Sequence, residues 1–231
     1  MKCRCLLAAL AAVTGCSNLT EAGGIVGLEI RVPRTPVVEV GQTIQLRARA
    51  LDRQGDSVAA TITWLTPDTT VTLTPTGLLT GRTGRTNARV QAQVGTLVSD
   101  FVIFTVNPRP DTLALAGDSV LTVAPGVTSS APLLASLRSF TPPEPLAGDV
   151  ITYTIVAPVF ADPAQRTVEL PGGVLSLAAT TGSDGAPATA VTLNRVTGQS
   201  SPDSAIVTVA AATATGATVP GSGQRFIVHF Q

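Results

Sequence analysis

VGQTIQLRARA, the stretch from Val40 to Ala50, is the most informative one for the fold. From Ile44 to Ala50 apolar and polar residues alternate, with Ile, Leu and Ala on one face and Gln and Arg on the other. Because successive side chains of a β-strand point to opposite faces, this pattern predicts a strand with one buried face. Leu28–Val32 and Ala88–Val94 alternate in the same way and predict two more such strands.

The segments around these strands predict further short strands separated by turns. Asp52–Asp56 contains a glycine and predicts a turn. More strands are expected at Thr61–Trp64, Val71–Leu73 and Leu97–Val106. Turn signals recur about every 8–12 residues, which is the spacing expected of a β-sandwich.

Several motifs of this region follow one another in the order of a known family. Val40–Leu46 is followed by Ile62-Thr63-Trp64 and then by TGLLTG at Thr76–Gly81. On these motifs residues 27–107 resemble the bacterial Ig-like group 2 domain. One departure is Thr66-Pro67-Asp68, where the family often has Ser-Ser-Asp. The resemblance implies an Ig-like sandwich of a kind that occurs in cell-surface adhesins and stalks.

Trp64 is the aromatic residue expected in the core of this sandwich, since alternation places it on the same face as Ile62. An exposed tryptophan that stacks on a ligand is the alternative. The turn glycines are Gly41, Gly77 and Gly81. Gly77 and Gly81 are expected to supply backbone angles that other residues resist.

The second half of the chain predicts another β-sandwich. Residues 108–110 form a Pro-containing hinge, because proline restricts both itself and its predecessor. Residues 111–231 then form the second Ig-like domain, with a proline-rich loop at Thr141–Pro145. Pro145–Thr154 and Thr181–Leu193 resemble in part the invasin-like, group 1 bacterial Ig-like domains. The expected strands are Thr112–Ala116, Ser119–Val123, Leu133–Arg138, Val150–Val156, Thr167–Leu170, Val174–Ala178, Thr189–Asn194, Ala205–Ala211 and Arg225–Phe230.

The start of the chain resembles the signal of a bacterial lipoprotein. Two basic residues precede an apolar run from Leu6 to Val13, and Val13-Thr14-Gly15 leads into Cys16 as in a lipobox. The run is shorter than the about 20 residues that a membrane-spanning helix needs. It suits a signal peptide instead, and an ordinary secretory signal is the alternative.

The lipobox resemblance implies a signal peptide at residues 1–15 and a lipid, such as palmitate, on Cys16. Residues 16–26 would then form a lipid-anchored tether. Ser17 would permit sorting to the outer membrane, on its periplasmic face or at the cell surface. Of the chain's three cysteines, only Cys16 would remain in the mature protein.

Composition and residue types argue against several classes of function. The formal net charge is zero, so no basic field is present to attract nucleic acid. The only histidine, His229, lies in an alternating terminal segment and is a poor catalytic base. The acidic pair Asp52 and Asp56 offers fewer oxygen ligands than calcium usually needs and is interpreted as a solvated turn. We therefore expect no catalytic residue, no metal site and no cofactor.

These observations predict a lipid-anchored, non-enzymatic protein of the cell envelope. Its Ig-like domains would serve adhesion or binding at the cell surface, with a protein or glycan as the partner. A structural spacer or accessory subunit of an envelope assembly is the first alternative, and an unusual hydrolase is the second. The sequence does not indicate the oligomeric state.

Overall fold

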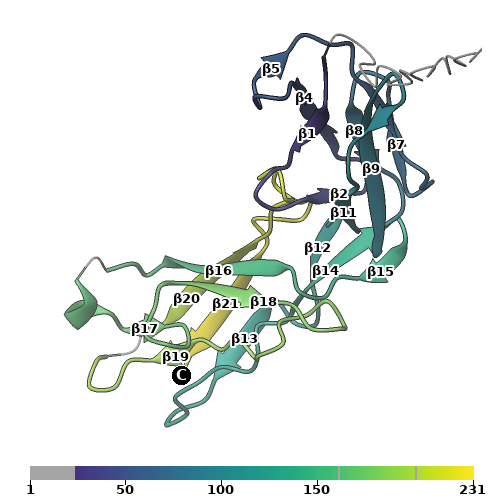
Figure 1. The fold of residues 1–231 in the computed structure, drawn as a ribbon. Helices are drawn as coiled ribbons and strands as arrows, with labels where there is room; N and C mark the ends of the chain where they lie inside the picture. The colour runs from purple at the N-terminus through teal and green to yellow at the C-terminus, as the bar shows by residue number, and fades with distance from the viewer. Residues whose placement is uncertain (1–23, 161, 201) are drawn as a thin grey trace, which may run out of the picture.

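The computed structural model describes residues 24–160, 162–200 and 202–231. The predicted signal peptide, Cys16 and most of the tether lie outside these residues. The described part is all-β apart from one 3-10 turn, η1 (Pro163–Gln165), and forms two sandwiches in tandem (Figure 1). The prediction of an all-β chain with two tandem Ig-like β-sandwiches is confirmed.

The N-terminal sandwich is built from eleven short strands. Its strands are β1 (Gly27–Arg31), β2 (Val37–Glu39), β3 (Thr43–Gln45), β4 (Arg47–Leu51), β5 (Ser57–Val58), β6 (Thr63–Leu65), β7 (Val71–Leu73), β8 (Leu78–Gly81), β9 (Thr86–Val94), β10 (Leu97–Val98) and β11 (Val102–Asn107). One layer consists of the ladders β1-β4-β5 and β3-β8-β7, and the other is β10-β9-β11-β2 with β6 also paired to β9. The alternating apolar residues of both layers meet in one core, which includes Trp64, Leu79, Val90 and Phe104.

The alternating stretch that predicted one strand at Ile44–Ala50 is divided between two ladders. β3 pairs with β8, whereas β4 pairs with β1. Between them the Leu46 N–H donates to the Gly77 carbonyl, so the chain changes partner at this residue. The strand expected at Leu97–Val106 is also divided, because Ser99 bonds to Ala92 with both its backbone and its hydroxyl before β11 begins.

The C-terminal sandwich has a larger core and a more regular main sheet. Its strands are β12 (Thr112–Leu115), β13 (Val120–Val123), β14 (Ala135–Phe140), β15 (Pro143–Pro145), β16 (Val150–Ala157), β17 (Val168–Glu169), β18 (Ser176–Thr180), β19 (Asn194–Arg195), β20 (Ser204–Ala210) and β21 (Arg225–Phe230). The main sheet has the order β13-β21-β20-β16-β18, and β12-β14-β15 faces it. Tyr153, Val207 and Phe226 are fully buried in the core between them.

Two segments of this half differ from the sequence-based expectation. The proline-rich loop expected at Thr141–Pro145 contains the edge strand β15, which pairs with β14. Prolines are tolerated there because an edge strand does not need every N–H for pairing. Conversely, Thr189–Asn194 does not form the expected strand, although Val191 and Leu193 are buried. Their carbonyls accept single bonds from Leu133 and Ser130, so this segment is held without a regular ladder.

Candidate functional site

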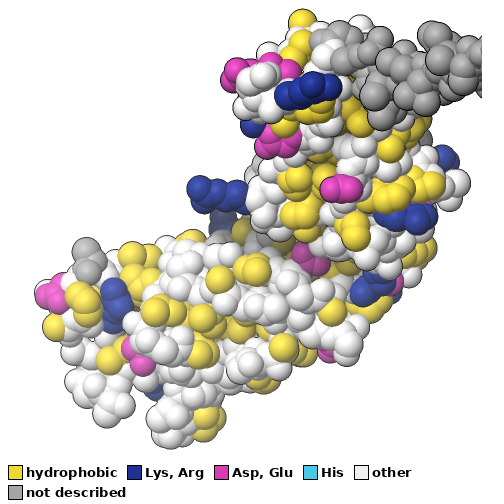
Figure 2. Space-filling view, viewed as in Figure 1, with side chains coloured by type: hydrophobic (Ala, Val, Ile, Leu, Met, Phe, Trp, Pro, Cys, Tyr) yellow, Lys and Arg dark blue, Asp and Glu magenta, His cyan; other side chains and the backbone are white. Residues whose placement is uncertain are grey.

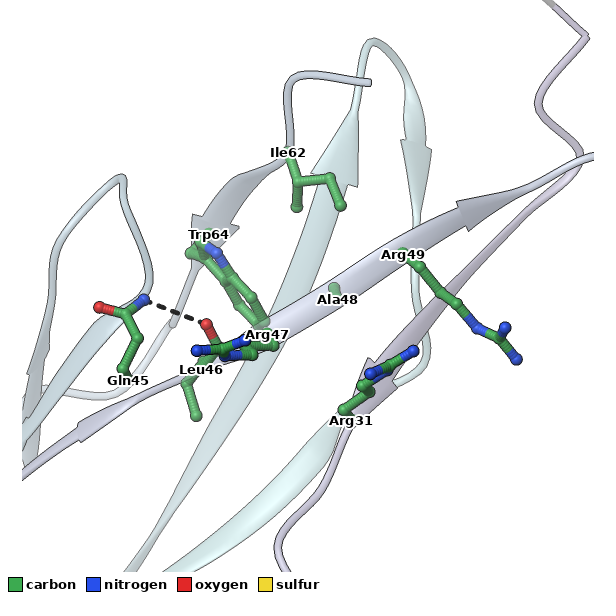
Figure 3. A pocket seen from close by; sticks show the side chains of 8 residues that line it. All are labelled: Arg31, Gln45, Leu46, Arg47, Ala48, Arg49, Ile62 and Trp64. Carbon is green, nitrogen blue, oxygen red and sulfur yellow. Dashed lines mark hydrogen bonds between the residues drawn. The ribbon is translucent and has the colours of Figure 1, made fainter. Parts of the chain in front are cut away.

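A groove of about 520 Å³ opens in the N-terminal sandwich between β4 and the segment that leads into β6. We call it the arginine groove, because guanidinium groups are its main polar lining. Figure 3 shows the Trp64 indole extending toward β4, with Arg31 and Arg49 on the β1 side. The lining residues are Arg31, Gln45, Leu46, Arg47, Ala48, Arg49, Ile62 and Trp64.

The pairing of β1 with β4 places these arginines. Glu29 lies opposite Arg49, and Arg31 lies opposite Arg47. Residues two apart share one face of a strand, so all four side chains project from the same face. Arg49 is paired with Glu29 at 2.6 Å. Within the part of the chain that the structure describes, Arg31 and Arg47 form no ion pair, so two like charges face each other across the ladder.

The groove exists because β4 lacks a continuous neighbour on its second edge. On that side β4 pairs with β5 only at Ala50 and Leu51. Leu46, just before β4, bonds to Gly77 at the start of β8. Across the described residues no strand pairs with Arg47–Arg49 on this side, and the gap exposes the groove down to Trp64.

Sequence reasoning did not single out these arginines. Both alternating strands were predicted, and with them the polar faces that hold Arg31, Arg47 and Arg49. The sequence did not reveal the register of the two strands, which places Arg31 opposite an arginine and not opposite an acidic residue. Arginine at every second position of one predicted strand, with a further arginine at the end of another, is the signal that could have found the groove.

Trp64 lies at the base of the groove as part of the N-terminal core. Its side chain is 8% exposed, so it offers no open ring face to a ligand. Gly77 lies directly against it, since a Cβ at that position would fall 2.5 Å from the indole Nε1. The indole therefore closes the groove from below.

The three glycines named from the sequence have different roles. Gly41 and Gly77 have φ values of 78° and 86°, in the left-handed region that favours glycine. Gly81 is outside that region, so the expectation of a special backbone angle is wrong for this residue. Its requirement is space, because a Cβ there would lie 2.5 Å from the Glu39 carbonyl oxygen.

A second place where functional groups gather is the contact between the two sandwiches, which we call the junction. The Glu39 carboxylate, buried at the end of β2, accepts a hydrogen bond from the Ala214 N–H at 2.8 Å. Arg85 donates to Glu144 at 2.6 Å on the other side. Residues far apart in the sequence thus connect the two sandwiches at two points in addition to the predicted hinge.

The hinge segment itself is closely packed. A Cβ on Gly84 would lie 2.7 Å from the Pro108 nitrogen, so the turn before β9 rests directly on the linker. Arg109 pairs with Asp111 at 2.7 Å and fixes the end of the linker to the start of the second sandwich. The proline segment is therefore embedded in contacts from both domains.

Two carboxyl groups of the junction have perturbed acidity. Burial raises the pKa of Glu39, and its bond from Ala214 only partly offsets this. Burial likewise raises the pKa of Asp149, which the Arg85 guanidinium partly lowers again. Both residues line a small cavity of about 150 Å³ at the junction. Protonation of either group therefore favours the state in which that carboxyl is buried.

The outer face of the sheet β10-β9-β11-β2, which also includes β6, carries a group of exposed apolar side chains. Leu65, Val98, Phe101 and Ile103 are each between 41% and 55% exposed. Arg89 lies over the Phe101 ring at 5.7 Å and forms a bidentate pair with Asp68. Figure 2 shows that hydrophobic side chains reach the surface of both sandwiches, with charged groups scattered between them.

The described residues contain no group of three or more His, Cys, Asp or Glu placed to hold a metal ion. In the turn where calcium was considered, the Asp52 carboxylate accepts the N–H groups of Gln54 and Asp56 and so stabilises the turn. Within the same residues no helix is long and apolar enough to span a membrane. Cys16 lies outside the described part.

No protein-family model matches the chain, and no curated protein matches it. The resemblance of residues 27–107 to the group 2 domain therefore stays a prediction. Similar solved structures include domains 4 and 5 of the S-layer protein SbsC, with 15% identity, TM-score 0.31, and coverage of 90% of this chain and 99% of that one.

The Yersinia pseudotuberculosis adhesin InvE has 16% identity and a TM-score of 0.40, with 91% of this chain and 62% of that one covered. The fibronectin(III)-like modules of Clostridium thermocellum CbhA have 14% identity and a TM-score of 0.38, with 88% and 94% covered. Because these TM-scores are low, the two sandwiches are assigned from the strand ladders and hydrophobic cores described above.

Proposed function

We propose that this chain is a non-enzymatic protein of the bacterial cell envelope, lipid-anchored at Cys16, that binds a partner through its Ig-like sandwiches. The observation that supports binding best is the arginine groove, which is open and carries two guanidinium groups without a carboxylate partner. Like charges directly opposite each other destabilise a ladder. A fold that keeps such a pair beside an open groove is well suited to receive an anionic group.

The anchor is tested by fractionating cells that express the full chain or its Cys16→Ala variant. The parent should sediment with membranes, and the variant should move to the soluble envelope fraction. A Ser17→Ala variant is the control, since it alters the neighbouring residue and leaves the cysteine. Unchanged membrane association of Cys16→Ala contradicts lipidation at this residue.

Binding is tested with a labelled chain made without residues 1–16, titrated onto isolated envelopes from cells that lack the protein. A saturable signal supports a binding protein, whereas a linear signal over the whole range contradicts it. The second candidate function, a spacer in an envelope assembly, is favoured by the junction, whose contacts hold the two sandwiches at one angle. A spacer that makes no contact of its own with envelope components gives the linear signal in this titration.

A further inference from the structure

We propose that the arginine groove binds an extended acidic peptide segment of a partner protein, which adds as a strand to the open edge of β4. This inference rests on the binding function proposed above and names the chemistry of the partner. It follows from three properties of the groove: its charge, its free strand edge and its closed base.

The charge of the groove points to an anionic group. Side chains directly opposite each other on antiparallel strands have Cβ atoms about 4.5–5.5 Å apart, so the Arg31 and Arg47 side chains share one small region. Arg49, the third arginine, is already neutralised by Glu29. A carboxylate placed beside Arg47 would relieve the repulsion and could accept a bidentate bond from a guanidinium.

The charge of the whole domain agrees with this assignment. Residues 24–110 contain nine arginines and six acidic residues, a formal charge of +3. Residues 111–231 contain four arginines and eight acidic residues, a formal charge of −4. The groove therefore lies on the basic sandwich, and an acidic segment is attracted to it in preference to the other domain.

The strand edge points to a peptide. A strand edge without a partner presents N–H and C=O groups that can pair with another chain, and proteins use this for strand addition. β4 has such an edge at Ala48, whose N–H and C=O point away from β1, between the contact at Leu46 and the pairing of Ala50 with β5. An added strand would lie one strand spacing, about 4.8 Å, from β4 and two from β1. An acidic side chain facing outward would then stand beside Arg47, with Arg31 just beyond it.

The closed base argues against a sugar. Carbohydrate and single-stranded nucleic acid sites rely on exposed rings for stacking. Trp64 is 8% exposed and Gly77 packs directly against its five-membered ring, so it cannot present such a ring. The indole instead gives the groove an apolar base with Ile62, which suits an aliphatic side chain that points inward. The expected segment therefore alternates acidic and aliphatic residues.

Trp64 also makes the proposal measurable, because it is the only tryptophan of the chain and lines the groove. The probe is the peptide acetyl-TEVEVET-amide, titrated into the two-domain chain made without residues 1–16 while tryptophan fluorescence is recorded. We expect a saturable change with this peptide and at least tenfold weaker binding of acetyl-TQVQVQT-amide. Inorganic phosphate and a soluble polyuronate are titrated in parallel.

The decisive variant is Arg31→Gln/Arg47→Gln, which should weaken peptide binding at least tenfold. Its matched control is Arg82→Gln/Arg225→Gln, which removes two exposed charges outside the groove and should bind as the parent does. Thermal unfolding checks folding, and the first variant should unfold no earlier than the parent, since it removes a like-charge pair.

Several outcomes would overturn the proposal. These are no fluorescence change, equal binding of both peptides, tighter binding of the polyuronate or of phosphate, or equal weakening by the control variant. A fluorescence change that depends on protein concentration alone would assign the groove to a second copy of the chain. The envelope titration offers the components of the envelope in place of these peptides, so it can still be saturable when the peptide tests fail.

Discussion

Removal of the Glu39 carboxylate should loosen the junction between the two sandwiches. Glu39 closes β2, and its side chain reaches Ala214 in a loop of the other domain, 175 residues away in sequence. Glu39→Ala removes this bond and leaves the backbone of both domains unchanged. Glu39→Gln is the matched variant, because an amide oxygen can accept the same N–H without a charge.

The size of the effect follows from the kind of bond. A hydrogen bond to a charged group contributes about 1.5–3 kcal/mol. The burial that raises the pKa of Glu39 shows that its charge is costly there, so part of this contribution is offset. We expect Glu39→Ala to weaken the coupling of the domains by about 1–2 kcal/mol, which raises the separated population about 5–30-fold.

The measurement is a distance distribution between one spin label on each sandwich. Thr72→Cys and Ala178→Cys provide exposed attachment sites, and no native cysteine lies beyond Cys16. The parent should give one narrow distribution. Glu39→Ala should add a broad component at pH 7, and Glu39→Gln should stay as narrow as the parent.

An unchanged distribution for Glu39→Ala would refute this reasoning, because the bond to Ala214 would then not determine the angle of the domains. Equal broadening in both variants would also contradict it, since the carboxylate would then matter by its charge and not as an acceptor. Urea unfolding of each variant separates loosening of the junction from loss of either core.

The remaining predictions concern pH, packing and a buried hydroxyl. Because burial raises the pKa of Asp149, its contribution to stability is fully present below the ordinary aspartate pKa and is lost as pH rises through the raised pKa. Asp149→Asn should therefore reduce the dependence of the urea unfolding midpoint on pH between pH 3 and 7. An unchanged pH dependence would exclude this residue as the cause. Gly77→Ala should lower the free energy of unfolding by at least about 2 kcal/mol, because it combines a left-handed φ with a collision against the indole. Gly55 also has a left-handed φ but lies in open space, so Gly55→Ala should lower it by about 1 kcal/mol. Equal losses in chemical unfolding would show that the collision is relieved. Tyr153→Phe should lower the free energy of unfolding by about 1–2 kcal/mol in the same assay. The fully buried Tyr153 hydroxyl donates to a backbone carbonyl at 3.0 Å, and this carbonyl would lose its partner. An unchanged stability would mean that the carbonyl finds another donor.

Strand positions were predictable from the sequence where burial alternates along the chain. The apolar residues of Ile44–Ala50 and Ala88–Val94 do face the core, because the period of two follows from strand geometry. Alternation does not reveal the partner strand, which is why the division at Leu46 was not foreseen. In Thr189–Asn194 the apolar positions are buried, but neighbouring loops and not a strand satisfy the backbone, and no local pattern distinguishes these cases.

The candidate sites depend on contacts between distant residues. The arginine groove needs the register of β1 against β4, and the junction needs Glu39 beside Ala214. The alternating arginines of β4 are a local signal for a charged face but do not reveal which residue lies opposite them. Glu39 looks like an ordinary solvated side chain in its own segment. Gly81 shows the same limit, because the close approach of the Glu39 carbonyl is created by the fold alone.

The two parallel ladders determine how each sandwich responds to a pulling force. β2 runs parallel to β11, and β13 runs parallel to the final strand β21. Within each sandwich an early strand thus lies beside the last one, pointing the same way. Tension between the two ends of the chain would pull these neighbours lengthwise past each other. Their cross-strand bonds would bear the load together instead of opening one at a time, so both sandwiches resist stretching along the chain better than a hairpin pulled apart from one end.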